Sequence, residues 1–100
     1  MAGTPHGQKF ASNRPVVMAR RGMVSSGHPL ASQAGITMLQ KGGNAIDAAL
    51  AVATTISVVE PLMSGIGGDG FIMVYTKADD KLQVVNATGA APYAATLDRY

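Results

Sequence analysis

The segment 45–59, AIDAALAVATTISVV, constrains the fold more than any other part of the sequence. It predicts a helix, because Asn44 is a good N-cap and Asp47 suits the positive end of a helix dipole. The pair Glu60-Pro61 ends this helix. The segment is apolar nearly all round, and a helix without a polar face is buried on more than one side. Other parts of the protein are therefore expected to cover it.

The chain has little material for such cover. It holds 100 residues, of which 47% are hydrophobic and 14% are charged. That length suffices for one small domain, which buries about 60–70% of the surface that its unfolded chain exposes. The apolar content argues against a disordered chain. We therefore interpret residues 1–15 as a flexible N-terminal arm and residues 16–100 as an incomplete domain that belongs to something larger.

One element is predicted on each side of the apolar helix. Residues 29–41 form a first helix, because proline is favoured at the first helical position and Gly42-Gly43 stops a helix. Residues 71–76 and 82–86 form a β-hairpin whose turn contains Asp79-Asp80. The predicted fold class is therefore α/β, of the layered α+β kind, with two helices followed by a β-hairpin.

The composition excludes several kinds of site and partner. Eight Lys and Arg against six Asp and Glu leave a net charge of +2. Only Arg20-Arg21 form a basic pair, so no nucleic-acid partner is expected. The absence of cysteine excludes disulfides, thiolate nucleophiles and cysteine-bound zinc. His6 and His28 are too few and too isolated to form a histidine metal cluster.

Targeting and membrane signals are also missing from the sequence. The uncharged run 48–59 is shorter than the about 20 residues that a membrane helix needs, so no membrane span is expected. Residues 1–14 contain no apolar signal-peptide core. The compartment stays unknown, with the cytoplasm slightly favoured.

A glycine-rich loop, Gly65-Ile66-Gly67-Gly68-Asp69-Gly70, matches the dinucleotide-binding pattern G-x-G-x-x-G. That pattern binds a pyrophosphate only when it follows a strand and opens a helix. Here it follows a helix and precedes a strand, so no nucleotide site is expected. Two interpretations stay open, a tight glycine turn or a loop whose bare backbone borders a substrate.

The titratable side chains have structural explanations from the sequence alone. His28 precedes the first helix and suits packing or capping, and Asp47 suits a helix terminus. Glu60 could be a buried hydrogen-bonded group, but no second carboxylate is paired with it for acid–base work. Asp79 and Asp80 are turn residues. No serine stands in a G-x-S-x-G elbow, and no Ser/His/Asp set is recognisable.

Three blocks of the sequence nevertheless resemble the gamma-glutamyltranspeptidase family, in the family's order. They are RGMVSSGHPLAS at 21–32, LQKGGNAIDAA at 39–49 and VEPLMSGIGGDGF at 59–71. The third block is the strongest. Together the blocks cover roughly residues 20 to 97 and are highly specific for the family. The resemblance implies an N-terminal nucleophile hydrolase with an αββα sandwich. The chain would then be the N-terminal portion of the large subunit.

The resemblance also implies a mechanism. Family members cut themselves, and the new N-terminal threonine of the small subunit becomes the nucleophile, with its own amine as base. An acyl-enzyme forms and passes its acyl group to water or an amine. That threonine and the oxyanion-hole glycines lie downstream, so no catalytic residue is expected in this chain, which alone would be inactive. The implied partners are the remainder of its own polypeptide and a small-molecule amide, with no metal or organic cofactor.

The predicted substrate-binding residues are Thr88 and Gly89. In gamma-glutamyl enzymes of the family, an arginine before an Ala-Pro pair grips the substrate α-carboxylate, a bidentate task for a guanidinium. Alignment on Ala91-Pro92 places Thr88 at the arginine position and Gly89 at the acidic position after it. Threonine brings no charge, and a lost charge-assisted contact costs about 1.5–3 kcal/mol. The glycine loop also departs from the family, because Asp69 stands where a further glycine is common.

Three functions stay open at this point. The first is a gamma-glutamyltransferase or glutathione hydrolase. The second is an amidohydrolase or acylase of the same family that acts on other amides. The third is a non-catalytic stand-alone module. A downstream residue could also replace the missing arginine.

Overall fold

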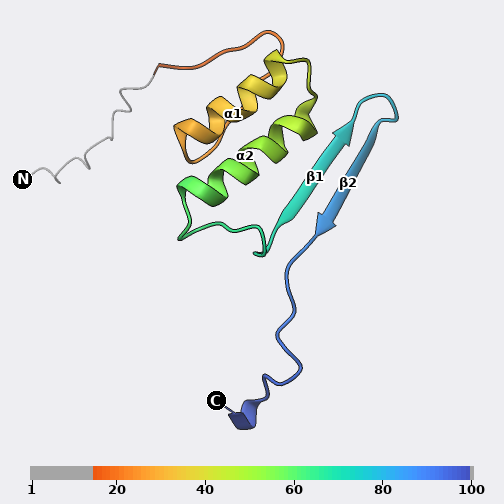
Figure 1. Ribbon diagram of the computed structural model, residues 1–100. Helices are drawn as coiled ribbons and strands as arrows, with labels where there is room; N and C mark the ends of the chain where they lie inside the picture. Colours follow the sequence, from red (N-terminus) through yellow and green to blue (C-terminus); the bar gives the residue numbers. More distant parts are fainter. Residues whose placement is uncertain (1–14, 100) are drawn as a thin grey trace, which may run out of the picture.

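The computed structural model describes residues 15–99 and contains two helices followed by a two-stranded antiparallel sheet (Figure 1). In chain order the elements are α1 (Pro29–Gln40), α2 (Ala45–Val59), β1 (Phe71–Thr76), β2 (Lys81–Asn86) and a short 3-10 helix, η1 (Leu97–Arg99). The predicted helices and hairpin are confirmed, and β2 begins one residue earlier than predicted. The predicted arm of residues 1–15 lies, except for Pro15, outside the described residues.

Local hydrogen bonds fix both ends of α1. The Leu30 amide donates to His28 Nδ1 at 3.2 Å, so His28 is the N-cap, and Pro29 follows as the first helical residue. At the other end the Gly42 and Gly43 amides donate to carbonyls of the last helical turn. Gly42 has φ +90°, which glycine adopts at little cost. The predicted capping role of His28 and the glycine stop are confirmed.

A capping box opens α2. Asn44 Oδ1 accepts hydrogen bonds from the amides of Ile46 and Asp47 at 2.8 and 3.0 Å. In return, Asp47 Oδ2 accepts one from the Asn44 amide at 2.8 Å. Three backbone amides at the start of the helix thus find partners, and the Asn44 and Asp47 side chains serve each other's backbone reciprocally. The predicted role of Asp47 at the helix terminus is confirmed.

The two helices pack side by side over small residues (Figure 1). Ala31 is fully buried, and Ala48 is 4% exposed. A Cβ at Gly35 of α1 would lie 2.8 Å from a methyl group of Val52 on α2, and 2.8 Å from one of Val24 in the segment before α1. The small core therefore depends on the absence of a side chain at position 35.

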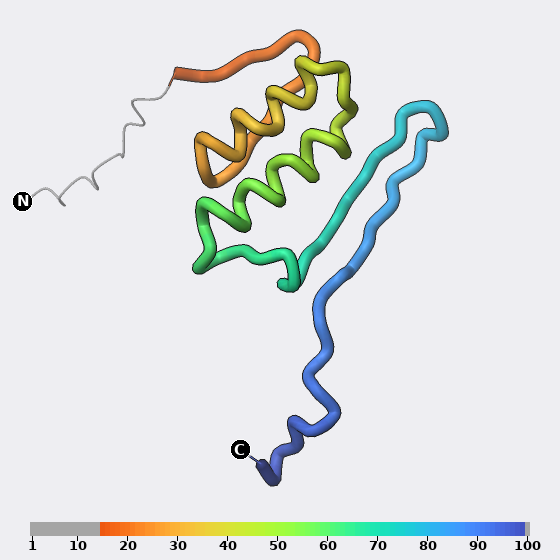
Figure 2. Tube along the Cα trace, viewed as in Figure 1, coloured from red at the N-terminus to blue at the C-terminus, as the bar shows by residue number. Residues whose placement is uncertain are grey.

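The hairpin pairs Phe71 with Asn86 at its open end and Thr76 with Lys81 beside its turn. Asp80 adopts φ +48° in that turn, which confirms its predicted role. Its carboxylate accepts a hydrogen bond from the Tyr75 hydroxyl at 2.8 Å, and this bond raises the pKa of Tyr75. In Figure 2 the chain after β2 runs away from the helices.

Within residues 15–99, helix α2 is covered on one side only, and the cover expected on its other sides does not come from these residues. Helix α1 covers one side, but Leu50 and Val58 on α2 are 61% and 77% exposed. The hairpin also leaves large apolar side chains open to solvent, and every residue of β2 is exposed. The helix forms because its caps are local, whereas the cover that its apolar surface needs does not come from these residues.

Candidate functional site

The candidate site lies where the glycine loop meets the end of the hairpin. The loop follows a turn after α2 in which the Met63 and Ser64 amides donate to the Glu60 carbonyl. A hollow of about 610 Å³ separates the loop from the second half of α2. Its lining is Ala53, Ile56, Ser57, Met63, Ser64, Gly65, Gly68 and Asp69.

Three of the four glycines in the loop are not demanded by the local backbone. Gly65, Gly67 and Gly70 have no atom within 4 Å of a Cβ position, and none of them has a left-handed φ. Residues with side chains would fit these positions within the described part of the protein. The Gly68 amide donates to the Gly65 carbonyl at 3.0 Å, and a Cβ at position 68 would lie 3.2 Å from that oxygen, so the loop does contain a tight turn. Both interpretations, a tight glycine turn and a backbone surface beside a substrate, stay open.

Hydrogen bonds hold the predicted residues Thr88 and Gly89 beside this loop. The Thr88 hydroxyl donates to Asn86 Oδ1 at 2.7 Å, and the Thr88 amide donates to the same atom at 3.1 Å. The Gly89 amide donates to Asp69 Oδ1 at 3.0 Å, across 20 positions of sequence. Both predicted residues are exposed. The structure therefore places the predicted residues Thr88 and Gly89 beside Asp69 of the glycine loop.

Sequence reasoning missed Asn86 as part of this site. An Asn that receives bonds from the amide and hydroxyl two residues later forms an Asx turn, and such turns have a recognisable composition. The pattern Asn-x-Thr at 86–88 was the available signal. The partnership of Asp69 with Gly89 had no local signal, because it depends on the pairing of β1 with β2.

The remaining polar candidates lie apart from this site. The half-buried Glu60 carboxylate lies beside Gly27, where a Cβ would be 3.4 Å from Glu60 Oε1. No hydrogen bond within residues 15–99 reaches this carboxylate, so the suggested buried hydrogen-bonded group is a wrong expectation there. Ser26 bonds to the hydroxyl of Ser32 at 2.7 Å and donates to the His28 carbonyl. These contacts support the start of α1 and form no nucleophile–base pair.

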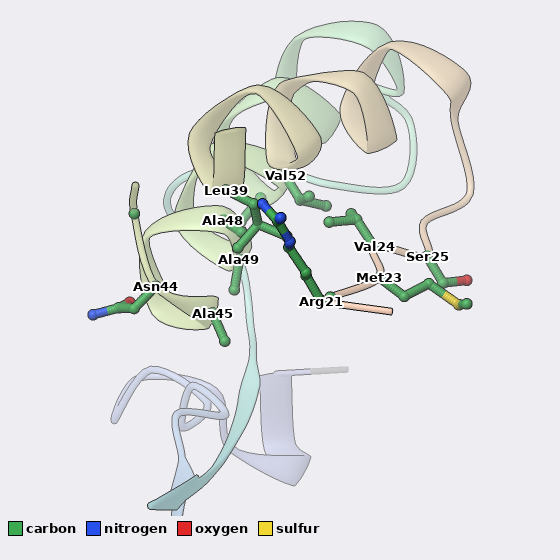
Figure 3. A pocket seen from close by; sticks show the side chains of 13 residues that line it. Arg21, Met23, Val24, Ser25, Leu39, Asn44, Ala45, Ala48, Ala49 and Val52 are labelled. Carbon is green, nitrogen blue, oxygen red and sulfur yellow. The ribbon is translucent and has the colours of Figure 1, made fainter. Parts of the chain in front are cut away.

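A second hollow, of about 570 Å³, lies between residues 21–25 and the two helices. Figure 3 shows the Arg21 side chain extended toward Leu39, Ala48 and Ala49. Arginine commonly lays its aliphatic stem along such an apolar surface. No acidic residue lines the hollow, so it contains no acid–base pair.

The part of the chain that the structure describes contains neither a metal-binding cluster nor a membrane-spanning helix. No group of three or more His, Cys, Asp or Glu side chains there is arranged to hold a metal ion. Among the same residues, no helix has the length and apolar character required to cross a bilayer.

Comparison with known proteins identifies the family. The family model described as gamma-glutamyltranspeptidase matches residues 31–100. The chain belongs to the gamma-glutamyltranspeptidase family. This confirms the resemblance of the three sequence blocks, and the α+β arrangement is that of the family's N-terminal nucleophile hydrolase fold.

Relatives within the family have different names. The glutathione hydrolase proenzyme of Bacillus subtilis (strain 168) is 46% identical over 93 residues, which are 93% of this chain and 16% of that protein. The oxamate amidohydrolase proenzyme of Klebsiella pneumoniae is 42% identical over 83 residues, which are 83% of this chain and 16% of that protein. The chain therefore spans about a sixth of the curated relatives that it matches.

A solved member of the gamma-glutamyltranspeptidase family has the same arrangement. The crystal structure of Helicobacter pylori gamma-glutamyltranspeptidase superposes with a TM-score of 0.73 at 39% identity. The match covers 82% of this chain and 23% of that chain. The two helices and the hairpin are thus the N-terminal part of a larger fold.

Proposed function

We propose that this chain is the N-terminal part of the large subunit of an amide hydrolase or acyltransferase of the gamma-glutamyltranspeptidase family. The reaction would pass through an acyl-enzyme on a threonine downstream of residue 100. The threonine hydroxyl attacks the amide carbonyl, the amine leaves with the proton, and water or a second amine then takes the acyl group. The match of the family model over residues 31–100 carries this proposal.

In that enzyme, this chain would line the part of the active site that binds the acyl group of the substrate. Thr88 and Gly89 are exposed and lie beside a loop whose bare glycine backbone leaves room for a ligand. The site so formed has hydroxyl and amide groups from residues 86–89 and a carboxylate from Asp69, but no guanidinium. A substrate α-carboxylate would find no cationic partner at position 88.

We therefore propose further that γ-glutamyl amides are poor substrates of the whole protein. A charge-assisted hydrogen bond stabilises binding by about 1.5–3 kcal/mol, which is roughly ten- to a hundredfold or somewhat more. The amidohydrolase name of one relative supports an acyl group other than glutamyl as the alternative within this family. A downstream arginine that reaches the same place would remove this restriction.

The test compares acyl groups on the complete natural protein. Turnover of a γ-glutamyl anilide is measured beside the oxalyl anilide (oxanilate) and anilides of uncharged acyl groups, at equal concentration. We expect kcat/KM for the γ-glutamyl anilide to be at least about tenfold below that for the best uncharged acyl amide. Efficient γ-glutamyl turnover contradicts the substrate proposal alone. Failure to turn over any amide contradicts the enzymatic proposal.

A further inference from the structure

We propose that Asp69 is a positioning residue that fixes the Thr88–Gly89 segment against the glycine loop. The inference deepens the proposed function and rests on it for its kinetic consequence. Its basis is the hydrogen bond from the Gly89 amide to Asp69 Oδ1 at 3.0 Å. Asp69 belongs to the loop that leads into β1, whereas Gly89 belongs to the segment that leaves β2.

The bond lies where regular strand pairing has just ended. The last regular pair of the hairpin is Phe71 with Asn86. One further pair follows, in which Ala87 donates to the Gly70 carbonyl at 2.9 Å and Gly70 donates back at 3.4 Å. Beyond that pair, the bond between Asp69 and Gly89 is the one hydrogen bond within residues 15–99 that joins the loop to the departing segment. The position of the segment therefore depends on the Asp69 side chain.

Gly89 is shaped for this contact. A Cβ at position 89 would lie 3.3 Å from Asp69 Oδ1, which is tighter than ordinary van der Waals contact. A side chain there would require the carboxylate to shift by a few tenths of an ångström from the amide that donates to it. Glycine at position 69, in turn, would offer no acceptor. The residues at 69 and 89 thus fit each other as a pair.

Thr88 is held on both sides as a result. Asn86 Oδ1 accepts from the Thr88 amide at 3.1 Å and from its hydroxyl at 2.7 Å. Asp69 fixes the next amide along the chain. Loss of the Asp69 acceptor would release Gly89 and leave Thr88 anchored on one side only. Because ordering this segment would then cost entropy when substrate binds, substrate affinity falls while the nucleophile, which lies elsewhere, is unchanged.

The experiment uses the full-length protein with its best amide substrate and compares Asp69→Ala, Asp69→Asn and Asp79→Ala. Asparagine keeps an oxygen acceptor at the same place, and Asp79→Ala removes an equal charge from the hairpin turn. We expect Asp69→Ala to raise KM about three- to tenfold with kcat within about twofold. Asp69→Asn and Asp79→Ala are expected to stay within about twofold of the unchanged protein. An unchanged KM in Asp69→Ala, or equal losses in Asp69→Ala and Asp69→Asn, overturns the inference.

A second measurement is independent of activity. Hydrogen exchange of the Gly89 amide reports the bond directly, and Asp69→Ala is expected to speed it while Asp69→Asn retains most of the protection. Unchanged exchange in Asp69→Ala overturns the inference even if no substrate is found or the variant is poorly processed.

Thr88→Val separates this inference from the proposed function. A raised KM in Thr88→Val with an unchanged KM in Asp69→Ala overturns the positioning role alone. An unchanged KM in Thr88→Val contradicts the placement of the acyl group beside residue 88, and the exchange measurement then decides the role of Asp69.

Discussion

Thr88 lies two residues beyond the end of β2, with its hydroxyl bonded to Asn86 Oδ1 at 2.7 Å. Its side chain is exposed, so a longer residue would fit there without displacing the described parts of the protein. The alignment on Ala91-Pro92 makes this the position where gamma-glutamyl enzymes of the family are expected to carry arginine. A positive charge at the proposed acyl site could therefore be supplied by a substitution at this one position.

Thr88→Arg is predicted to raise the activity of the whole protein on γ-glutamyl substrates. A guanidinium can bind the substrate α-carboxylate through two parallel hydrogen bonds. We expect kcat/KM for a γ-glutamyl anilide to rise about tenfold or more, as measured by steady-state kinetics. Thr88→Gln is the matched control, since it adds length and donors without charge. A gain in Thr88→Gln equal to that in Thr88→Arg, or no gain in either, contradicts the assignment of position 88.

At the scale of elements, the contact of α1 with α2 depends on Gly35. A Cβ there would lie 2.8 Å from Val24 Cγ1 and from Val52 Cγ2, a distance that forces side chains or backbone to move. The neighbouring core residues are alanines, so few flexible side chains are available to absorb the shift. Overpacking of this kind costs about 1–3 kcal/mol, against a gain of about 1 kcal/mol in helix propensity on replacing glycine.

Gly35→Ala is therefore predicted to lower the free energy of unfolding of the full-length protein by up to about 2 kcal/mol. Thermal and denaturant unfolding measure the change, with the exposed Gln40→Ala on the same helix as control. The control is expected to stay within about 0.5 kcal/mol of the unchanged protein. Stabilisation by Gly35→Ala would mean that the helices can separate without loss, and that the close approach does not hold the pair together.

The elements also show what the sequence can and cannot predict. The helix ends were predictable because caps are local: proline and glycine mark α1, and Asn44 with Asp47 forms a box within four residues. The link from Asp69 to Gly89 was not predictable, since it joins residues 20 positions apart through the register of the hairpin. Thr88 and Gly89 were found through family resemblance, and no propensity or periodicity singles them out.

At the scale of the whole molecule, the main feature is apolar surface without cover among the described residues. Leu50, Val58, Phe71 and Val84 lie on three different elements and are each at least 60% exposed. Soluble proteins rarely leave contiguous apolar patches of large size open to water. The chain spans 16% of the Bacillus subtilis relative, so the rest of a protein of that length could supply the missing cover.

The last prediction concerns the mass of the natural protein under denaturing conditions. We expect two chains whose total is several times the 10.2 kDa of this sequence, because relatives are named proenzymes and self-cleavage creates the proposed nucleophile. Denaturing mass spectrometry of protein taken from its source measures both chains, and N-terminal sequencing of the smaller one is expected to begin with threonine. A single uncut chain of large mass would leave the family and fold unchanged and contradict self-cleavage. A single chain near 10.2 kDa would lack the proposed downstream threonine nucleophile. That result would favour the interpretation as a non-catalytic module.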